Sequence, residues 1–277
     1  MPSEVRTSAV AGSWYPADPA ALRAELDRYL AGAAPPPADG ALVALISPHA
    51  GLRYSGPVAA WGYSLLRQEA PRTVVLVGPS HRALFRGVAL WARGEWRTPL
   101  GVIPIDETLA ERLLAAHPQV RDERAPHAAE HSLEMQLPFL QHLWPGLRIV
   151  PALMGSQTSE EVEALAAALT RVLEPGGALL VASSDLSHYQ PAERAAQLDG
   201  AVIEQVRRYD PEALMRLVDS HQHACGGGPM VAVMKAAAAL GAQRASILRY
   251  ADSGDVEAGD KSQVVGYLSA ALVGKAA

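Results

Sequence analysis

Two histidines and the only cysteine of the chain stand where they could bind a metal ion. His49 follows an apolar run that ends at Ile46, and His81 follows one that ends at Val77. Cys225 begins the segment Cys-Gly-Gly-Gly-Pro, ahead of a helical stretch. In α/β proteins, ligand sites collect in the crevice beyond the carboxyl ends of the strands. Two imidazoles and one thiolate in that crevice would bind a metal ion and leave coordination positions open for chemistry.

A third apolar run, 178–183, leads directly to Asp185 and His188. A carboxylate can fix the tautomer of an imidazole and raise its basicity, so the pair predicts a general acid/base in which Asp185 orients His188. Asp185 could equally cap the turn after the strand, and the two roles are compatible. Because parallel strands end at the same edge of a sheet, the histidines after the three strands are predicted to share one site.

Cys225 has two competing interpretations. A lone cysteine is most often a small buried hydrophobe. A position at a helix N-terminus, however, lowers the pKa of a thiol and favours the thiolate that a soft metal needs. His221 and His223 precede Cys225 and offer a compact alternative site, which ranks lower because they alternate along an extended segment.

Aromatic and polar residues in other loops are candidates for a pocket wall. Trp14, Tyr15 and Tyr54 lie in loop segments and could line a small-molecule or peptide pocket, with core packing as the alternative. His131 could line the same cleft, although the polarity of a helix start explains it nearly as well. Its neighbours Ser132 and Glu134 are expected to be ordinary first-turn residues.

Three further histidines lack a supporting context: His117, His127 and His142 are expected at the surface.

Composition favours an ordinary globular protein. The chain has 277 residues, of which 49% are hydrophobic and 19% charged, and a formal net charge of −5. It has no cluster of Lys and Arg, so nucleic acid is not an expected partner. The single cysteine excludes an internal disulfide and fits a reducing compartment. With neither a signal-peptide core nor a membrane-length apolar run, the expected location is the cytoplasm.

Several common mechanisms find no support in the motifs. The sequence contains no phosphate-binding loop with a Lys-Ser/Thr pair, no Gly-x-Gly-x-x-Gly dinucleotide loop and no Gly-x-Ser-x-Gly nucleophile elbow. The sequence therefore argues against ATP-dependent, NAD-dependent and serine-hydrolase functions.

Strand and helix patterns alternate along the chain, which predicts an α/β fold with a central, mostly parallel sheet and helices on both faces. No internal repeat or domain boundary is evident, so residues 1–277 are expected to form one domain. The segment 87–105 is typical of a hairpin excursion. The expected strands are 41–46, 73–77, 148–153, 178–183, 246–250 and 264–271; the expected helices are 19–30 (capped by Asp18), 57–68, 107–116, 131–143, 160–173, 192–208, 211–218 and 229–240.

Taken together, these motifs resemble the Memo family, whose prokaryotic members are called AmmeMemoRadiSam system protein B. The set runs in family order and covers nearly the whole chain. The matching segments are 11–16 (Ala-Gly-Ser-Trp-Tyr-Pro), 47–51 (Ser-Pro-His-Ala-Gly), 78–81 (Gly-Pro-Ser-His), 130–134 (Glu-His-Ser-Leu-Glu), 183–188 (Ser-Ser-Asp-Leu-Ser-His), Cys225-Gly226 with Pro229, and 264–267 (Val-Val-Gly-Tyr).

The resemblance implies a fold similar to the class III extradiol dioxygenases, which are non-heme iron enzymes. His49, His81 and Cys225 would be the metal ligands, and His188 would match the acid/base histidine of those enzymes. Cys225 stands where the dioxygenases are expected to use a carboxylate. A thiolate is softer and oxidisable, so Fe(II) is preferred, copper is possible and zinc is less expected.

The family also implies partners, and two positions depart from its pattern. The prokaryotic name predicts association with an AMMECR-type protein and a radical-SAM protein. Leu52 stands where an aromatic residue is expected, so one pocket wall would differ. Gly227 and Gly228 stand where relatives often carry larger or basic side chains, which weakens any anion-binding role for that loop.

Three functions are compatible with these residues. The leading hypothesis is a dioxygenase-like redox enzyme with one non-heme iron or copper ion, which acts with O₂ on a small substrate. The second is a non-enzymatic module that binds a peptide, a small ligand or a metal ion. The third is a zinc-dependent hydrolase in which His188 activates water.

Overall fold

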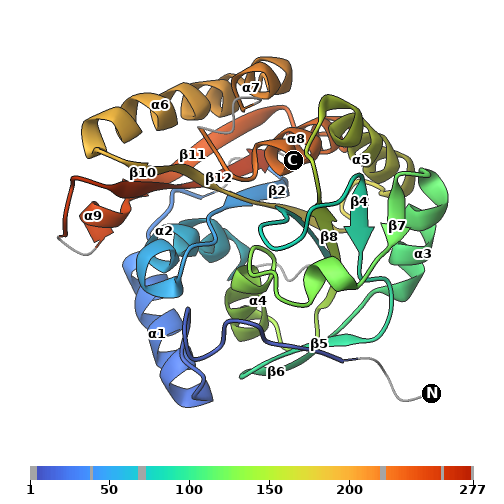
Figure 1. Cartoon of the computed structure of the whole chain (residues 1–277), viewed down its shortest axis with the longest axis horizontal. Coiled ribbons are helices and arrows are strands. Elements are labelled where there is room, and N and C mark those ends of the chain that lie inside the picture. The colour runs from blue at the N-terminus through green and yellow to red at the C-terminus, as the bar shows by residue number, and fades with distance from the viewer. Residues whose placement is uncertain (1–4, 38–39, 68–72, 219–222, 257–258, 276–277) are drawn as a thin grey trace.

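A large central sheet with helices on both faces forms the body of the molecule (Figure 1). The structure is a computed structural model and describes residues 5–37, 40–67, 73–218, 223–256 and 259–275. Within these ranges the main sheet has nine strands, and a second sheet has three. The predicted α/β class is confirmed.

The centre of the main sheet consists of four parallel strands, β2 (Leu42–Ser47), β9 (Leu179–Ser183), β3 (Thr73–Pro79) and β8 (Arg148–Met154), in that spatial order. Every residue of β3 and β9 is buried. Helices cover both faces of these strands, so their sequences are continuous apolar runs and do not alternate. That is the pattern from which three of them, β2, β3 and β9, were predicted.

The flanks of the sheet are antiparallel, so the sheet as a whole is mixed. β12 (Val264–Val273) runs antiparallel to β2, to β10 (Asp185–Gln190) and to β11 (Arg244–Asp252). At the other flank, β4 (Val88–Leu90) is antiparallel to β8 and parallel to β7 (Val120–Asp122). The predicted parallel pairing therefore holds at the centre and between β4 and β7. The remaining pairs are antiparallel, as expected for short connections such as the one from β11 to β12.

The predicted hairpin excursion divides between two sheets. β5 (Glu95–Thr98) and β6 (Gly101–Pro104) form an antiparallel pair, and β1 (Val5–Thr7) adds to β5 in parallel. β4, which begins the same segment, joins the main sheet instead.

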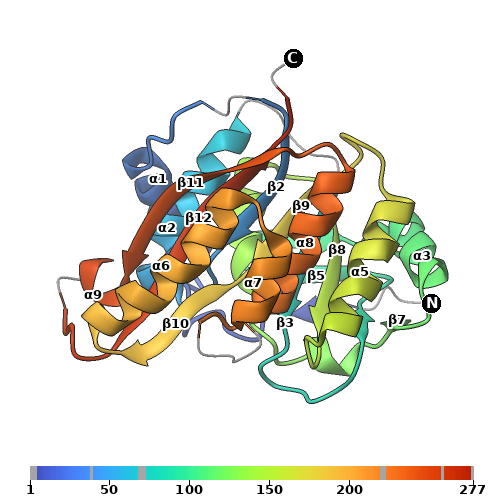
Figure 2. The ribbon, with the colours of Figure 1, turned by 90° about the horizontal axis from the view of Figure 1, so that it is seen from above.

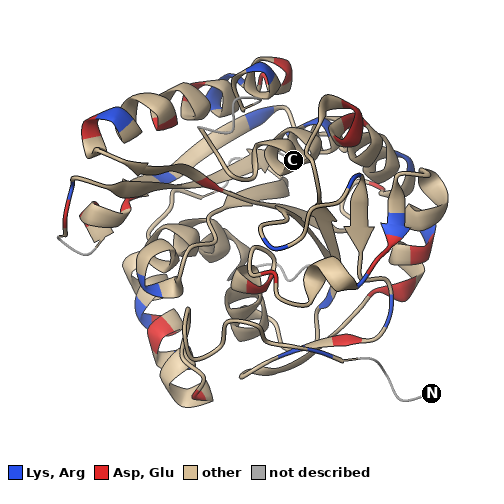
Figure 3. Ribbon diagram, viewed as in Figure 1, with Lys and Arg blue, Asp and Glu red and all other residues tan. Residues whose placement is uncertain are grey.

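Two helical layers enclose the sheet, and Figure 2 shows one of them in front of the strands. The helices α6 (Ala192–Arg208), α7 (Pro211–Val218), α8 (Gly227–Ala239) and α5 (Ser159–Val172) cover that face. The helices α1 (Pro19–Gly32), α2 (Leu52–Ser64) and α4 (Leu137–Leu143) cover the other face (Figure 1). Acidic and basic residues are interspersed along the outer helices (Figure 3). Within the described ranges, none of the helices is both long and apolar enough to cross a bilayer. The helices are α1 (Pro19–Gly32), α2 (Leu52–Ser64), α3 (Glu107–Ala116), α4 (Leu137–Leu143), α5 (Ser159–Val172), α6 (Ala192–Arg208), α7 (Pro211–Val218), α8 (Gly227–Ala239) and α9 (Ser253–Val256), with 3₁₀ turns at Leu65–Arg67, Ala125–His127 and Glu134–Gln136.

Two helix starts, those of α2 and α4, differ clearly from the prediction, whereas the start of α1 follows its local signal. Helix α4 begins at Leu137, after a 3₁₀ turn at Glu134–Gln136, and not at the predicted His131. Asp18 caps α1, since its Oδ1 accepts a hydrogen bond from the N–H of Ala21 at 2.8 Å. Helix α2 begins at Leu52, five residues before the predicted start at Pro57, and continues through that proline. The predicted end of this helix, Gln68, lies outside the described residues. Leu52 itself is buried in the core.

A buried ion pair fastens the N-terminal segment to the body of the molecule. Nη1 of Arg6 lies 2.7 Å from Oε2 of Glu134, and both side chains are buried. The carboxylate of Glu134 also accepts hydrogen bonds from the N–H groups of Ala9 and Val10 and from the hydroxyl of Tyr15. The interpretation of Glu134 as an ordinary first-turn residue was therefore wrong, since this carboxylate anchors residues 6–15.

His127 is a second correction, because it is fully buried and not at the surface. Its ring packs edge-on against the rings of Trp91 and Trp96, and its Nε2 donates a hydrogen bond to the carbonyl oxygen of Ala89 at 3.0 Å. Burial disfavours the charged imidazolium and lowers the pKa of His127 to about 3.

This burial predicts a stability loss in mild acid. Between the usual histidine pKa of 6.5 and the folded value of about 3, only the unfolded state binds the proton, so stability falls as the pH falls through this window. From pH 7 to pH 5, wild type should lose about 2 kcal/mol more unfolding free energy than His127→Phe. Urea unfolding at both pH values measures the difference, and an equal loss in the two proteins would contradict it.

Candidate metal centre

The register of the central strands brings the predicted site loops together. Ser47 of β2 pairs with Ser183 of β9, and Ala182 pairs with Val77 of β3. These parallel strands therefore end side by side. His49 and His81 lie in the loops that follow β2 and β3, at one edge of the sheet.

The three predicted ligands lie close to one another. Nε2 of His49 is 3.2 Å from Sγ of Cys225. One ligand atom from each of His49, His81 and Cys225 lies within 4.8 Å of the other two. His49 is buried, Cys225 is half-buried and His81 is exposed, so this cluster opens to solvent on the side of His81. These separations would allow one cation to contact all three side chains.

The hydroxyl of Ser183 fixes the tautomer of His49. It donates its single hydrogen to the carbonyl oxygen of Ser132 at 2.6 Å. It must therefore accept from its other partners, the Nε2–H of Gln136 at 2.8 Å and Nδ1 of His49 at 2.9 Å. Nδ1 of His49 carries the proton, and its Nε2 presents a lone pair toward Cys225.

The side chain of Gln136 holds this serine in place, and each of its polar atoms has a partner. Nε2 donates to the carbonyl oxygen of Pro48 at 3.0 Å as well as to Ser183, and Oε1 accepts from the hydroxyl of Tyr63 at 2.7 Å. Because the carbonyl of Pro48 can only accept, the orientation of the amide follows from its partners. Gln136 lies outside the motifs noted in the sequence, and Ser183 lies within one, 183–188, but was given no role there.

Glu130 plays the matching part for His81. Its Oε1 lies 3.0 Å from Nδ1 of His81 and also accepts from the N–H groups of His131 and Ser132. Its Oε2 accepts from the N–H of His81. Burial, the largest single effect, raises the pKa of Glu130. The hydrogen bond and charge of His81 and the hydrogen bond from the N–H of Ser132 together outweigh burial, so the pKa of Glu130 lies well below its usual value. A carboxylate that holds Nδ1–H leaves Nε2 of His81 for a ligand bond.

His131 connects the cluster to the N-terminal segment. Its ring stacks on that of His81 at 4.6 Å between centroids and lies 4.3 Å from the ring of Trp14. Burial lowers the pKa of His131 to about 4, so the ring is neutral at pH 7. Its buried Nδ1 has no hydrogen-bond partner among the described residues.

Asp185 and His188 do not form the predicted pair. Oδ1 of Asp185 accepts hydrogen bonds from the N–H groups of His49 and Ala50, at 2.7 and 3.2 Å. Within the described residues it shares no hydrogen bond with His188, so it positions the His49 loop instead. Burial raises the pKa of Asp185 to about 7. His188 is half-buried with an unpartnered Nε2, and burial, followed by the charge of His81, lowers its pKa.

The helix start at Cys225 does not favour a thiolate in the metal-free protein. Burial, and after it the charge of Asp185, raises the pKa of the Cys225 thiol well above its usual value. A metal ion would therefore have to displace the thiol proton. Among the described residues, a second group that could hold a metal ion is His81, Glu130 and His131. The alternative site next to Cys225 finds no support, because His223 belongs to neither group and His221 lies outside the described residues.

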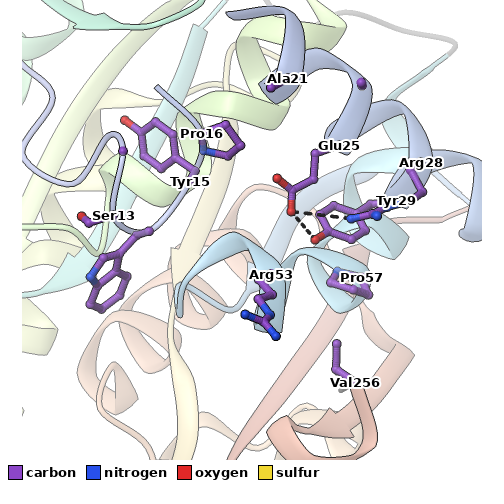
Figure 4. Close-up of a pocket in the computed structure, with 13 residues that line it drawn as sticks. Ser13, Tyr15, Pro16, Ala21, Glu25, Arg28, Tyr29, Arg53, Pro57 and Val256 are labelled. Atoms are coloured by element: carbon purple, nitrogen blue, oxygen red, sulfur yellow. Dashed lines mark hydrogen bonds and ion pairs between the residues drawn. The ribbon is translucent and has the colours of Figure 1, made fainter. Parts of the chain in front are cut away.

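A cavity of about 840 Å³ borders the N-terminal segment beside the cluster (Figure 4). Trp14 and Tyr15 line it, together with Arg53 of α2. The hydroxyl of Tyr15 is bound to Glu134, so this side chain is held as a wall. Tyr54 is exposed and does not line the cavity. The cavity contains no predicted metal ligand, and Trp14 is its connection to the cluster through His131.

Comparisons with known proteins agree on one family. A family model described as "Memo-like protein" matches residues 6–271. The chain is 40% identical to a MEMO1 family protein of Methanopyrus kandleri, over 95% of this chain and 96% of that protein. It is 39% identical to a MEMO1 family protein of Thermotoga petrophila, over 96% of this chain and 99% of the relative. The resemblance inferred from the motifs is confirmed.

A solved structure supports the fold alone. The crystal structure of an uncharacterized protein from Escherichia coli K12 superposes with a TM-score of 0.57 at 18% sequence identity. The match covers 84% of this chain and 100% of that chain.

The tautomer argument predicts a defined effect of Ser183→Ala. Without the hydroxyl, Nδ1–H of His49 loses its acceptor, so the affinity of the cluster for a divalent cation should fall about 10- to 100-fold. Competition titrations with a chromophoric chelator and Co²⁺ measure the change. Ser269→Ala is the matched control, because the buried hydroxyl of Ser269 has no hydrogen-bond partner in the described part of the chain. Equal affinities in the two variants would contradict the assignment.

Proposed function

Since the chain belongs to the family of Memo-like proteins, we propose that it is a metal-dependent redox protein whose cation is held by His49, His81 and Cys225. The observation that carries this proposal is the convergence of three ligand atoms within 4.8 Å, with the lone pair of His49 Nε2 aimed at the cysteine sulfur. The imidazoles of His49 and His81 each form a hydrogen bond through Nδ1, and this leaves Nε2 of both rings free to bind the cation.

The donor set favours a redox-active cation. Two imidazoles and one thiolate are a soft, strongly donating set that suits Fe(II) or copper, and Zn²⁺ also accepts it. Three protein ligands leave positions for substrate, whereas a structural site would need a fourth protein ligand. Fe(II) is our preferred cation, copper is the second and zinc the third. When bound, the cation would supply one-electron chemistry and Lewis acidity.

His188 is proposed to move the proton. Its Nε2 is unpartnered and its pKa is lowered by burial, so the ring is neutral and able to accept a proton near pH 7. Asp185 has a supporting part in this proposal: its carboxylate anchors the backbone of His49 and Ala50 and thereby places the His49 ring. His131, which stacks on His81, and Trp14, which contacts His131, are proposed as the wall toward the cavity.

The proposed substrate is a small, phenolic molecule that reacts with O₂ in a dioxygenase-like reaction. Aromatic walls at Trp14 and His131 provide flat apolar contacts for such a ring. Association with an AMMECR-type protein and a radical-SAM protein, and a cytoplasmic location, remain predictions from the family resemblance.

The metal assignment predicts that Cys225→Ala and His49→Ala abolish cation binding while the fold survives. Wild type purified without oxygen should bind close to one Fe(II) or Cu(I) per chain, and each variant should bind at least about 100-fold more weakly. Elemental analysis and anaerobic titration measure both quantities. His142→Ala, at a surface ion pair with Asp27, is the matched control and should bind as wild type does.

Unchanged metal binding in Cys225→Ala would refute the assignment. No transition metal in any of the proteins would favour the non-enzymatic binding module. Zinc together with hydrolytic activity would favour the hydrolase.

The acid/base assignment predicts a different outcome for His188→Gln. This variant should keep the metal affinity of wild type, because the side chain supports no predicted ligand. Its oxygen consumption with an active catechol from a phenol panel should fall about 100-fold, which is the usual size of a general acid/base effect. Parallel loss of metal and turnover would instead identify His188 as a ligand.

A further inference from the structure

The loop after β8 reaches the same edge of the sheet as the loops that carry His49 and His81. β8 pairs in parallel with β3 as far as Pro79 and Met154, so residues 155–158 leave the sheet beside the start of the His81 loop. Gln157 lies in this loop, between β8 and α5. No motif in the sequence marks this residue.

The carboxamide of Gln157 spans the turn that carries Cys225. Its Nε2 donates to the carbonyl oxygen of Cys225 at 2.9 Å, and its Oε1 accepts from the N–H of Gly228 at 3.0 Å. The N–H of Cys225 donates to the carbonyl oxygen of Asp185 at 3.2 Å. Both backbone polar groups of Cys225 are therefore held, one by β10 and the other by Gln157.

The glycines after Cys225 are a packing requirement of this arrangement. A Cβ at Gly228 would lie 2.8 Å from Cβ of Gln157, and a Cβ at Gly226 would lie 2.4 Å from the carbonyl oxygen of Ser183. A Cβ at Gly227 would lie 2.5 Å from Cβ of Val218. Larger side chains would push the turn away from the strand ends and from the amide.

The backbone of Gln157 is itself strained. Its φ of 56° lies in the left-handed region, which is costly for a residue with a Cβ. Flanking contacts hold it there: Thr158 and Glu161 form a capping box at the start of α5, and Gly155 packs closely under the carbonyl of Phe85. Such strain persists only where the surroundings over-determine it, and it concentrates at functional sites.

We propose that Gln157 is a positioning residue that fixes the sulfur of Cys225 relative to His49 and His81. The purpose of this positioning rests on the proposed function, in which Cys225 binds the cation. The positioning itself also acts in the metal-free protein, where the sole cysteine can be followed by its reactivity.

Two substitutions separate the amide from the backbone. Gln157→Gly removes the carboxamide and adopts the left-handed conformation without strain. Gln157→Glu keeps an acceptor for the N–H of Gly228 but places a carboxylate oxygen against the carbonyl of Cys225. Gln197→Ala, on the exposed face of α6, is the control.

Two readouts measure the effect. In metal-free protein, a disulfide reagent reports the reactivity of Cys225, which should rise about tenfold in Gln157→Gly as the turn opens more often. With Co²⁺, the thiolate-to-cobalt absorption should weaken and the affinity fall about tenfold. Gln157→Glu should lie between Gln157→Gly and wild type, and Gln197→Ala should match wild type. Equal unfolding midpoints across the set would exclude a general loss of structure.

Two results distinguish this inference from the proposed function. If thiol reactivity and the cobalt spectrum of Gln157→Gly equal those of wild type, the positioning role is overturned while the metal site stands. If Cys225 becomes more reactive in Gln157→Gly but wild type shows no thiolate-to-cobalt band, the positioning role is supported and the metal assignment fails.

Discussion

A hydroxyl group has one hydrogen to give, and the candidate centre depends on where Ser183 gives it. The hydrogen goes to the carbonyl oxygen of Ser132, so His49 and Gln136 must both donate to the same oxygen. This arrangement joins the end of β9, the loop after β2 and the turn that precedes α4. The lone pair of His49 Nε2 therefore points toward Cys225 because of the hydrogen bond that its Nδ1–H donates to Ser183. The in-register pairing of β2 with β9 places Ser183, at the end of β9, beside the loop that carries His49.

The centre of the fold and the ligand candidates could be predicted from the sequence because their signals are local. Buried parallel strands are continuous apolar runs, and a histidine after such a run lies at the sheet edge whatever the rest of the chain does. The same local reasoning placed Asp18 at the cap of α1. It also identified the motif that contains Glu130, although only the neighbouring His131 was considered there.

The features that were missed depend on contacts between distant parts of the chain. Glu134 has the local pattern of a first-turn residue. It is a buried anchor because Arg6 forms an ion pair with it and the N-terminal segment packs against it. His127 is buried by two tryptophans from another segment. For Cys225 the sequence left burial and a thiolate at the helix start as alternatives, and the burial that raises its pKa comes from the packed glycine turn against β9 and β10. Asp185 was assigned to its sequence neighbour His188 but bonds to a loop 136 residues away.

The protonated state of the Cys225 thiol has a consequence for the lifetime of the metal-free protein. Peroxides oxidise thiolates much faster than thiols, and a sulfenic acid at the sole cysteine would have no second cysteine in the chain to rescue it as a disulfide. Because burial raises the pKa of this thiol, we expect the protonated sulfur to react slowly with peroxides. The packing that holds the turn of Cys225 in place is therefore also expected to slow the oxidative loss of its sulfur.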